Sequence, residues 1–194
     1  MNRVFFILLL AFLFSANSVA ETESWYFNAS IGLSNTQYPD SGEQVIITAE
    51  NNNGVTRVSP ALDVGFYWPF FNDSILLGAV LNASIDSVQT GGGNEVVAHD
   101  LDYTGISAIK FFSDSIGKGF FVRGDYGSAT STYRFSNNLY EVDNGSGSAV
   151  LIGVGYGKPL SGDRARLIFS FNTITSTIND RDFSSNQLTI GLMW

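Results

Sequence analysis

The chain has 194 residues, with 18 acidic and 10 basic side chains, a net charge of −8 at pH 7 and no cysteine. An acidic chain lacks the basic face that phosphate backbones require, which excludes nucleic acid as a partner. The absence of cysteine excludes disulfides and a lipid-modified cysteine anchor.

The first twenty residues are predicted to be a cleaved secretory signal. Arg3 supplies a positive start, and Val4–Phe14 is an apolar run too short to span a bilayer as a helix. Small residues end at Ala20, where we expect cleavage. Residues 21–194 then form one barrel domain; a short N-terminal anchor is the alternative.

The first half of the remaining chain predicts four strands, because large apolar residues alternate with small or polar ones. They are expected near Ser24–Gln37, Val58–Trp68, Ile75–Val88 and Leu101–Phe112. In the fourth, the larger face is expected to turn outward, with Leu101, Tyr103, Ile109 and Phe111 opposite Asp102, Thr104 and Lys110.

The second half repeats the pattern. Strands are expected near Gly119–Thr132, Ser148–Gly157 and Ala165–Thr177, and a last one ends at Trp194. In that last strand Leu188, Ile190, Leu192 and Trp194 share one apolar face, for which lipid is the most economical cover.

The connections alternate in length. Those at 69–74, 113–118 and 158–164 are short, whereas 38–57, 89–100, 131–147 and 178–185 are longer and more polar. The prediction is an all-β fold, an eight-stranded antiparallel transmembrane up-and-down β-barrel, with its short turns on the periplasmic side. A soluble β-sandwich is the alternative, but the Gly- and Ser-rich second face suits a narrow lumen better.

Two groups of residues are expected to mark the outer and inner walls. An aromatic girdle should lie at the periplasmic interface, formed by Trp25, Phe27, Phe66, Trp68, Phe111, Phe120, Tyr156 and Trp194. Buried charges must be paired, so we expect a lumenal ionic network of Asp63, Lys110, Arg123, Asp125 and Arg166. Tyr67 and Phe121 should help to fill the lumen, which argues against a general porin.

Three segments carry a resemblance to a known family. "NQLTIGLMW" (186–194) is similar to the C-terminal assembly signal of outer-membrane proteins, and "GFFVRGDYGSA" (119–129) and "LIGVGYGKPLSGDRARLIFSF" (151–171) resemble strands of the opacity-protein-like, OmpA/OmpX-like small barrels. The resemblance implies an outer-membrane location and folding by the barrel-assembly machinery, through the strand that ends at Trp194. It leaves the activity open.

No motif predicts catalysis, a cofactor or a metal site. His99 could meet Asp100, Asp102 and Ser87 near the outer end, but nothing around it matches the lipid-modifying barrel enzymes. Arg123-Gly124-Asp125 spells an adhesion tripeptide inside a strand, and the run 141–145 lacks the full spacing of a calcium loop.

The sequence therefore predicts an integral outer-membrane barrel, in contact with membrane lipid and lipopolysaccharide, with a structural or surface-interaction role. The contact surfaces are expected in Tyr38–Arg57 and in Ser131–Gly147, where Tyr133, Arg134, Phe135 and Tyr140 would be exposed. A lipid-modifying enzyme and a narrow, low-conductance pore are the alternatives.

Overall fold

The computed structural model describes residues 25–38, 46, 48–49, 54–70, 74–113, 115–135, 140–160 and 164–194. The expected signal, residues 1–20, lies outside this part, and its cleavage stays a prediction. The described residues form strands β1 (Tyr26–Gln37), β2 (Val55–Val58), β3 (Pro60–Phe70), β4 (Ile75–Thr90), β5 (Glu95–Phe111), β6 (Gly119–Phe135), β7 (Tyr140–Pro159), β8 (Arg166–Ile178) and β9 (Arg181–Met193). They contain no helix long and apolar enough to cross a membrane.

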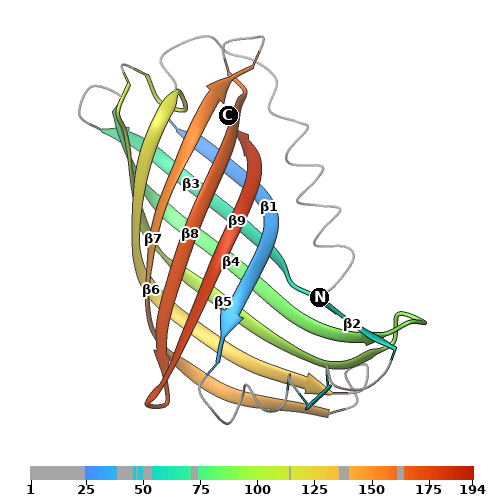
Figure 1. Cartoon of the computed structure of the whole chain (residues 1–194). Coiled ribbons are helices and arrows are strands. Elements are labelled where there is room, and N and C mark those ends of the chain that lie inside the picture. Colours follow the sequence, from blue (N-terminus) through green and yellow to red (C-terminus); the bar gives the residue numbers. More distant parts are fainter. Residues whose placement is uncertain are drawn as a thin grey trace.

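The strands close into a barrel (Figure 1). All neighbours are antiparallel, β1 pairs with both β3 and β9, and β4 pairs with β5 as well as β3. Because β2 and β3 both pair with β4 on either side of Ser59, they act as one interrupted strand. The predicted eight-stranded up-and-down barrel is confirmed.

The strands are tilted because the sheet closes with an offset. A line of directly paired residues that leaves β1 at Phe27 runs once around the barrel and returns to β1 at Gln37, ten residues further along. Strand number and offset together fix the tilt and the width of a barrel. Eight strands leave an interior just wide enough for side chains.

Large aliphatic side chains cover the outer wall. Ile31, Leu33, Ile152 and Leu188 are each about two-thirds exposed. The alternate residues of the same strands face inward and are buried or small, as predicted for seven of the eight strands. A continuous apolar exterior around a closed sheet is the surface that lipid covers.

The facing predicted for β5 is wrong. Leu101, Tyr103, Ile109 and Phe111 are buried inside the barrel, and the outward side is formed by Asp102, Thr104, Ile106, Ala108 and Lys110. Directly paired residues share a face. Tyr103 pairs with the inward Asn82, and Ile109 with the inward Arg123, so β5 turns its bulkier face inward.

Five strands continue beyond the apolar wall at the end opposite Trp194. β4, β5, β6 and β7 have 16, 17, 17 and 20 residues, whereas about 9–11 suffice to cross a bilayer. With β2 they form an extension, here called the protruding sheet, at the lower end of Figure 1. Much of the loop sequence predicted at 89–100 and 131–147 is therefore strand.

Glycines on the inner wall make room for Tyr67, which is fully buried. A Cβ at Gly65 would overlap the Tyr67 ring, whereas a Cβ at the outward Gly124 would meet nothing within 4 Å. We expect Gly65→Ala to lower the free energy of unfolding by about 1–3 kcal/mol, because the packed ring must move. Gly124→Ala, the matched control, should stay within about 0.5 kcal/mol of wild type. Urea unfolding in detergent measures both, and equal effects would contradict the proposed fit.

Candidate functional site

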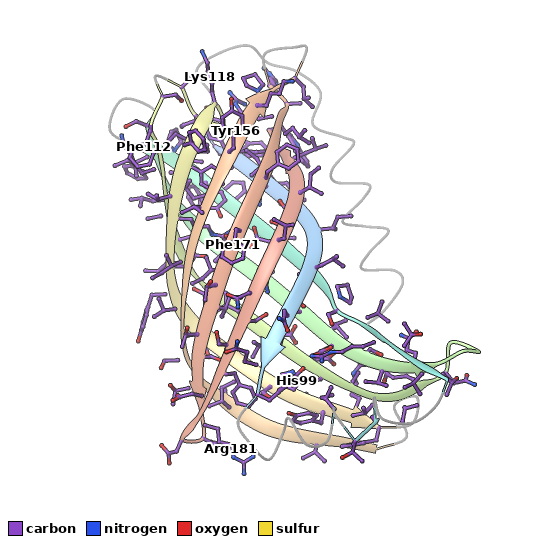
Figure 2. The ribbon with its side chains drawn as sticks, in the orientation of Figure 1. His99, Phe112, Lys118, Tyr156, Phe171 and Arg181 are labelled. Carbon is purple, nitrogen blue, oxygen red and sulfur yellow. The ribbon has the colours of Figure 1, made fainter. Side chains whose placement is uncertain are left out.

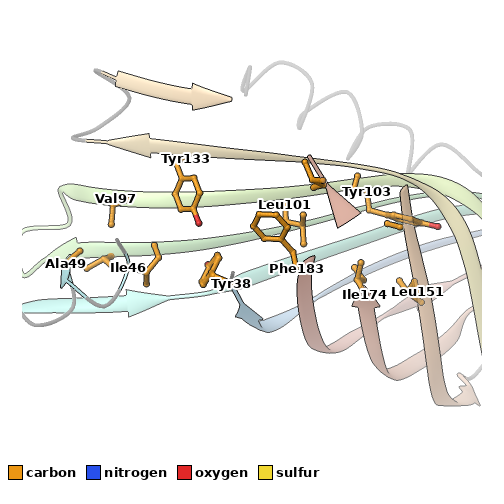
Figure 3. Close-up of a cluster of buried hydrophobic side chains, with 14 of the residues drawn as sticks. Tyr38, Ile46, Ala49, Val97, Leu101, Tyr103, Tyr133, Leu151, Ile174 and Phe183 are labelled. Atoms are coloured by element: carbon orange, nitrogen blue, oxygen red, sulfur yellow. The ribbon is translucent and has the colours of Figure 1, made fainter. Parts of the chain in front are cut away.

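The lumen is packed in layers. The end near Trp194 holds an apolar cluster formed by Tyr26, Tyr67, Leu76, Ile109, Phe111, Ile116, Phe121, Ile168 and Met193. A larger apolar cluster occupies the other end and includes Tyr38, Val97, Leu101, Tyr103, Tyr133, Leu151, Ile174 and Phe183 (Figure 3). Between them lies a polar layer.

Arg123 is the centre of that polar layer. Its guanidinium donates to both carboxylate oxygens of Asp63, over 2.7 and 2.9 Å, and to Asp125 over 2.8 Å. All three residues are at most 5% exposed. Asn28 and Asn82 also donate to Asp63, over 3.0 and 3.3 Å. Charge-assisted and bidentate bonds of this kind offset the cost of burying ions.

The other two residues expected in this network lie elsewhere. Lys110 points outward on β5, a correction that follows from the reversed facing of that strand, and its Nζ donates to Ser74 over 2.6 Å. Arg166 lies at the end of the lumen, where it donates to the carbonyl of Ile116 over 2.8 Å and its guanidinium carbon lies 5.1 Å from the Tyr26 ring centroid. Arg166, at the start of β8, thus holds the connection between β5 and β6 against the end of the barrel.

Most of the expected girdle residues lie on the outer wall near the short turns. Ring pairs are formed by Trp25 with Phe66, Phe27 with Trp194, Phe66 with Trp68, and Phe120 with Tyr156, at centroid distances of 4.7 to 5.4 Å. Phe111 is the exception and a wrong prediction: it is 1% exposed and packs inside on Phe121, 5.1 Å away.

Asp86 of β4 organises the outer mouth. Its carboxylate accepts hydrogen bonds from Tyr38, from Arg57 and, over 2.8 Å, from Ser59. These partners come from the end of β1, from β2 and from the break between β2 and β3. The sequence analysis assigned Tyr38 and Arg57 to a loop, so it did not predict this group.

His99 and Ser131 are neighbours beside that group; Figure 2 labels His99 at the end opposite Lys118. His99 Nε2 lies 2.8 Å from Ser131 Oγ, and both residues are at most 1% exposed. His99 Nδ1 has no hydrogen-bond partner among the described residues. The ring of Phe183 stacks on the imidazole of His99, with the two ring centroids 5.6 Å apart. The rings of Tyr38 and Tyr133 also lie against His99.

Two features of a serine hydrolase centre are not found at this pair among the described residues. A nucleophilic serine needs access to substrate and a histidine oriented by an acid, and neither condition is met at Ser131. The expected acids point away: Asp102 faces outward, and Asp100 accepts a hydrogen bond from Arg134. Ser87 is buried on the opposite face of β4 from Asp86, where its hydroxyl donates to Glu95.

The residues expected to form contact surfaces are partly buried. Tyr38 and Tyr133 are only 9% and 8% exposed, because both point into the mouth of the barrel. Arg134 pairs with Asp100 and Glu95. Most of the segment between β1 and β2 lies outside the described residues, although Ile46 within it is buried against the outer cluster.

No protein-family model matches the chain, and no curated protein matches it. Its structure resembles Ail, the attachment invasion locus protein of Yersinia pestis, solved with the heparin analogue sucrose octasulfate: the TM-score is 0.51 at 11% identity, over 88% of this chain and 99% of that one. It also resembles Neisserial surface protein A, with a TM-score of 0.50 at 14% identity, over 88% and 96%. The chain therefore has the fold of the small eight-stranded outer-membrane barrels.

Arg123→Met should destabilise the barrel by about 3–5 kcal/mol, because it leaves Asp63 and Asp125 buried without a cation. Lys158→Met, on the outer wall, is the matched control and should change the free energy of unfolding by at most about 0.5 kcal/mol. Combining Arg123→Met with Asp63→Asn should recover part of the loss. Urea titration in detergent is the measurement, and an unaffected Arg123→Met protein would show that the ion group contributes no net stability.

The packed lumen should not conduct solutes. Proteoliposomes that contain the barrel should swell in sugar solutions no faster than protein-free liposomes, since the two apolar clusters and the Arg123 layer fill the interior. A large general porin serves as the positive control. Swelling close to that of the porin would mean that the lumen opens in a membrane.

Proposed function

We propose that this outer-membrane barrel is a surface-interaction protein that acts through its protruding sheet, and that it is neither an enzyme nor a porin. One observation carries the proposal: the lumen is packed with side chains, while five strands extend beyond the lipid-facing wall. Strand residues outside the membrane do not help the chain to cross the bilayer, so we infer that they act at the cell surface.

The protruding sheet is held rigid, which favours a binding role. Arg134 of β6 bridges to Asp100 and Glu95 of β5, and the Asp86 group fixes β2 and the end of β1 against β4. A surface that is ordered before contact loses less conformational entropy on binding.

The charge of this end indicates the chemistry of the partner. Described acids at the outer end outnumber the described bases, and two of those bases, Arg57 and Arg134, are already paired with Asp86 and Asp100. The sequence between β1 and β2 adds Asp40, Glu43 and Glu50. Charge complementarity therefore favours a cationic peptide or protein. Ail was solved with a polyanion, but the acidic end of this chain disfavours such a ligand.

The arrangement of His99 and Ser131 supports a non-enzymatic role. His99 is enclosed by the rings of Tyr38, Tyr133 and Phe183, and its partner Ser131 is fully buried rather than exposed. The lipid-modifying alternative would need an accessible serine beside the membrane surface.

Trimming one hairpin tests where binding occurs. Thr130 and Ser146 face each other across β6 and β7, so an Asn-Gly turn can join them and remove the outer part of that hairpin. Cells that display the full barrel should bind more fluorescent polylysine than cells that lack it, with the difference shrinking as salt is added, and should bind no more fluorescent heparin. The trimmed barrel should still shift on a gel between unboiled and boiled samples, the sign of a folded barrel, but should bind polylysine more weakly, because Glu141, Asp143 and the ordered outer part of the hairpin are removed. Unchanged binding would refute the assignment to the protruding sheet.

A matched pair of charge variants tests the partner's chemistry. One triple variant removes acids at the outer end: Asp102→Asn, Asp180→Asn and Asp182→Asn. The control removes acids that lie in the sequence between β3 and β4, between β5 and β6, and between β7 and β8: Asp73→Asn, Asp114→Asn and Asp163→Asn. The outer variant should weaken polylysine binding at least about threefold, whereas the control should match wild type on whole cells. Equal behaviour of the two would contradict a cationic partner.

A further inference from the structure

The outer wall has a groove that crosses strands β4 to β7. The groove has a volume of about 500 Å³ and is lined by outward residues of these strands and by residues whose positions alternate with them and face inward, namely Gly78, Ser107, Asp125 and Leu151. Its shallowest side chains are Ala108 and Gly124, which pair directly across β5 and β6. Their neighbours in the same row, Leu77 on β4 and Ile152 on β7, are much larger. Two small residues between two large ones leave a gap in an otherwise continuous surface.

The rim of the groove is apolar. Ile106 and Tyr126 border it and project outward, with 70% and 62% of their surfaces exposed. Val150 continues the rim on β7. Since this part of the wall faces the hydrocarbon of the bilayer, a lipid acyl chain matches the chemistry of the groove.

A cation lies next to the groove. Lys110 follows Ala108 by two residues on β5, so the two side chains share the outward face. Lys110 Nζ donates to the hydroxyl of Ser74, and within the described chain no carboxylate forms an ion pair with it. A lysine on the lipid-facing wall is costly unless an anion compensates it.

The level of Lys110 matches that of lipid headgroups. Lys110 pairs with Val122 across β5 and β6, and the exposed rings of Phe112 and Phe120 lie at the same end of those strands. Exposed aromatics collect at the boundary between hydrocarbon and headgroups. The short turns mark this as the periplasmic side, where the leaflet is made of glycerophospholipid.

We propose that the groove binds one anionic glycerophospholipid of the periplasmic leaflet. An acyl chain lies over Ala108 and Gly124, and the phosphate contacts Lys110. This site is independent of the protruding sheet, which lies at the opposite end of the barrel.

Native mass spectrometry of the barrel in mild detergent, titrated with phosphatidylglycerol or with zwitterionic phosphatidylcholine, tests the proposal. Wild type should retain one phosphatidylglycerol with about fivefold preference over phosphatidylcholine. Gly124→Leu fills the groove and should reduce retention of both lipids about tenfold, the effect of one or two methylenes losing contact. Ala79→Leu is the matched control, because Ala79 is outward and exposed but does not line the groove.

The headgroup contact is tested separately. Lys110→Gln should abolish the preference for phosphatidylglycerol while phosphatidylcholine binding is retained, and Lys158→Gln, an exposed lysine on β7, should leave the preference intact. If Gly124→Leu shows no difference in gel mobility between unboiled and boiled samples, it has not folded, and Ala108→Val is then used as the groove-filling variant. Equal lipid retention by Gly124→Leu and Ala79→Leu, or no preference in wild type, would overturn the proposal. So would a wild-type dimer that Gly124→Leu dissociates, since the groove would then hold a second copy.

Discussion

Closure of the sheet is the constraint on which the rest of this structure depends. A bilayer offers no water to unpaired peptide groups, so a strand protein can cross it only without edges. The pairing of β1 with β9 and of β4 with β5 meets this requirement. The ten-residue offset between Phe27 and Gln37 then sets the tilt and, with eight strands, the width of the lumen. Every inward side chain must fit that width.

The narrow lumen explains the arrangement of its contents. Two apolar clusters enclose a layer in which Arg123 is shared by Asp63 and Asp125. Such ions are tolerated in a low-dielectric interior because they are paired with one another, and Asn28 and Asn82 add hydrogen bonds to Asp63. The interior is thus the core of the domain, and the surfaces left for interaction are the outer wall and the two ends.

The two ends differ in what holds them together. At the short-turn end, exposed aromatics and the Arg166 contacts surround an apolar cluster. At the other end, Asp86 gathers donors from three segments, and the ion pairs of Arg134 stiffen strands that have left the membrane. An organised, acidic extension on a packed barrel fits recognition at the cell surface better than transport. The likeness to Ail and to Neisserial surface protein A establishes the fold alone.

The sequence alone determined the class of fold, the strand order and the facing of seven strands, because period-two alternation is a local property. It also identified Asp63, Arg123 and Asp125 as inward residues, which follows from counting along regular strands. β5 carries apolar residues on both faces, so local pattern misplaced Phe111 and Lys110; pairing with Asn82 and Arg123 decided its orientation. The Asp86 group and the groove over Gly124 join residues from different strands. Only tertiary structure could decide these, because cross-strand register depends on the closure of the whole sheet.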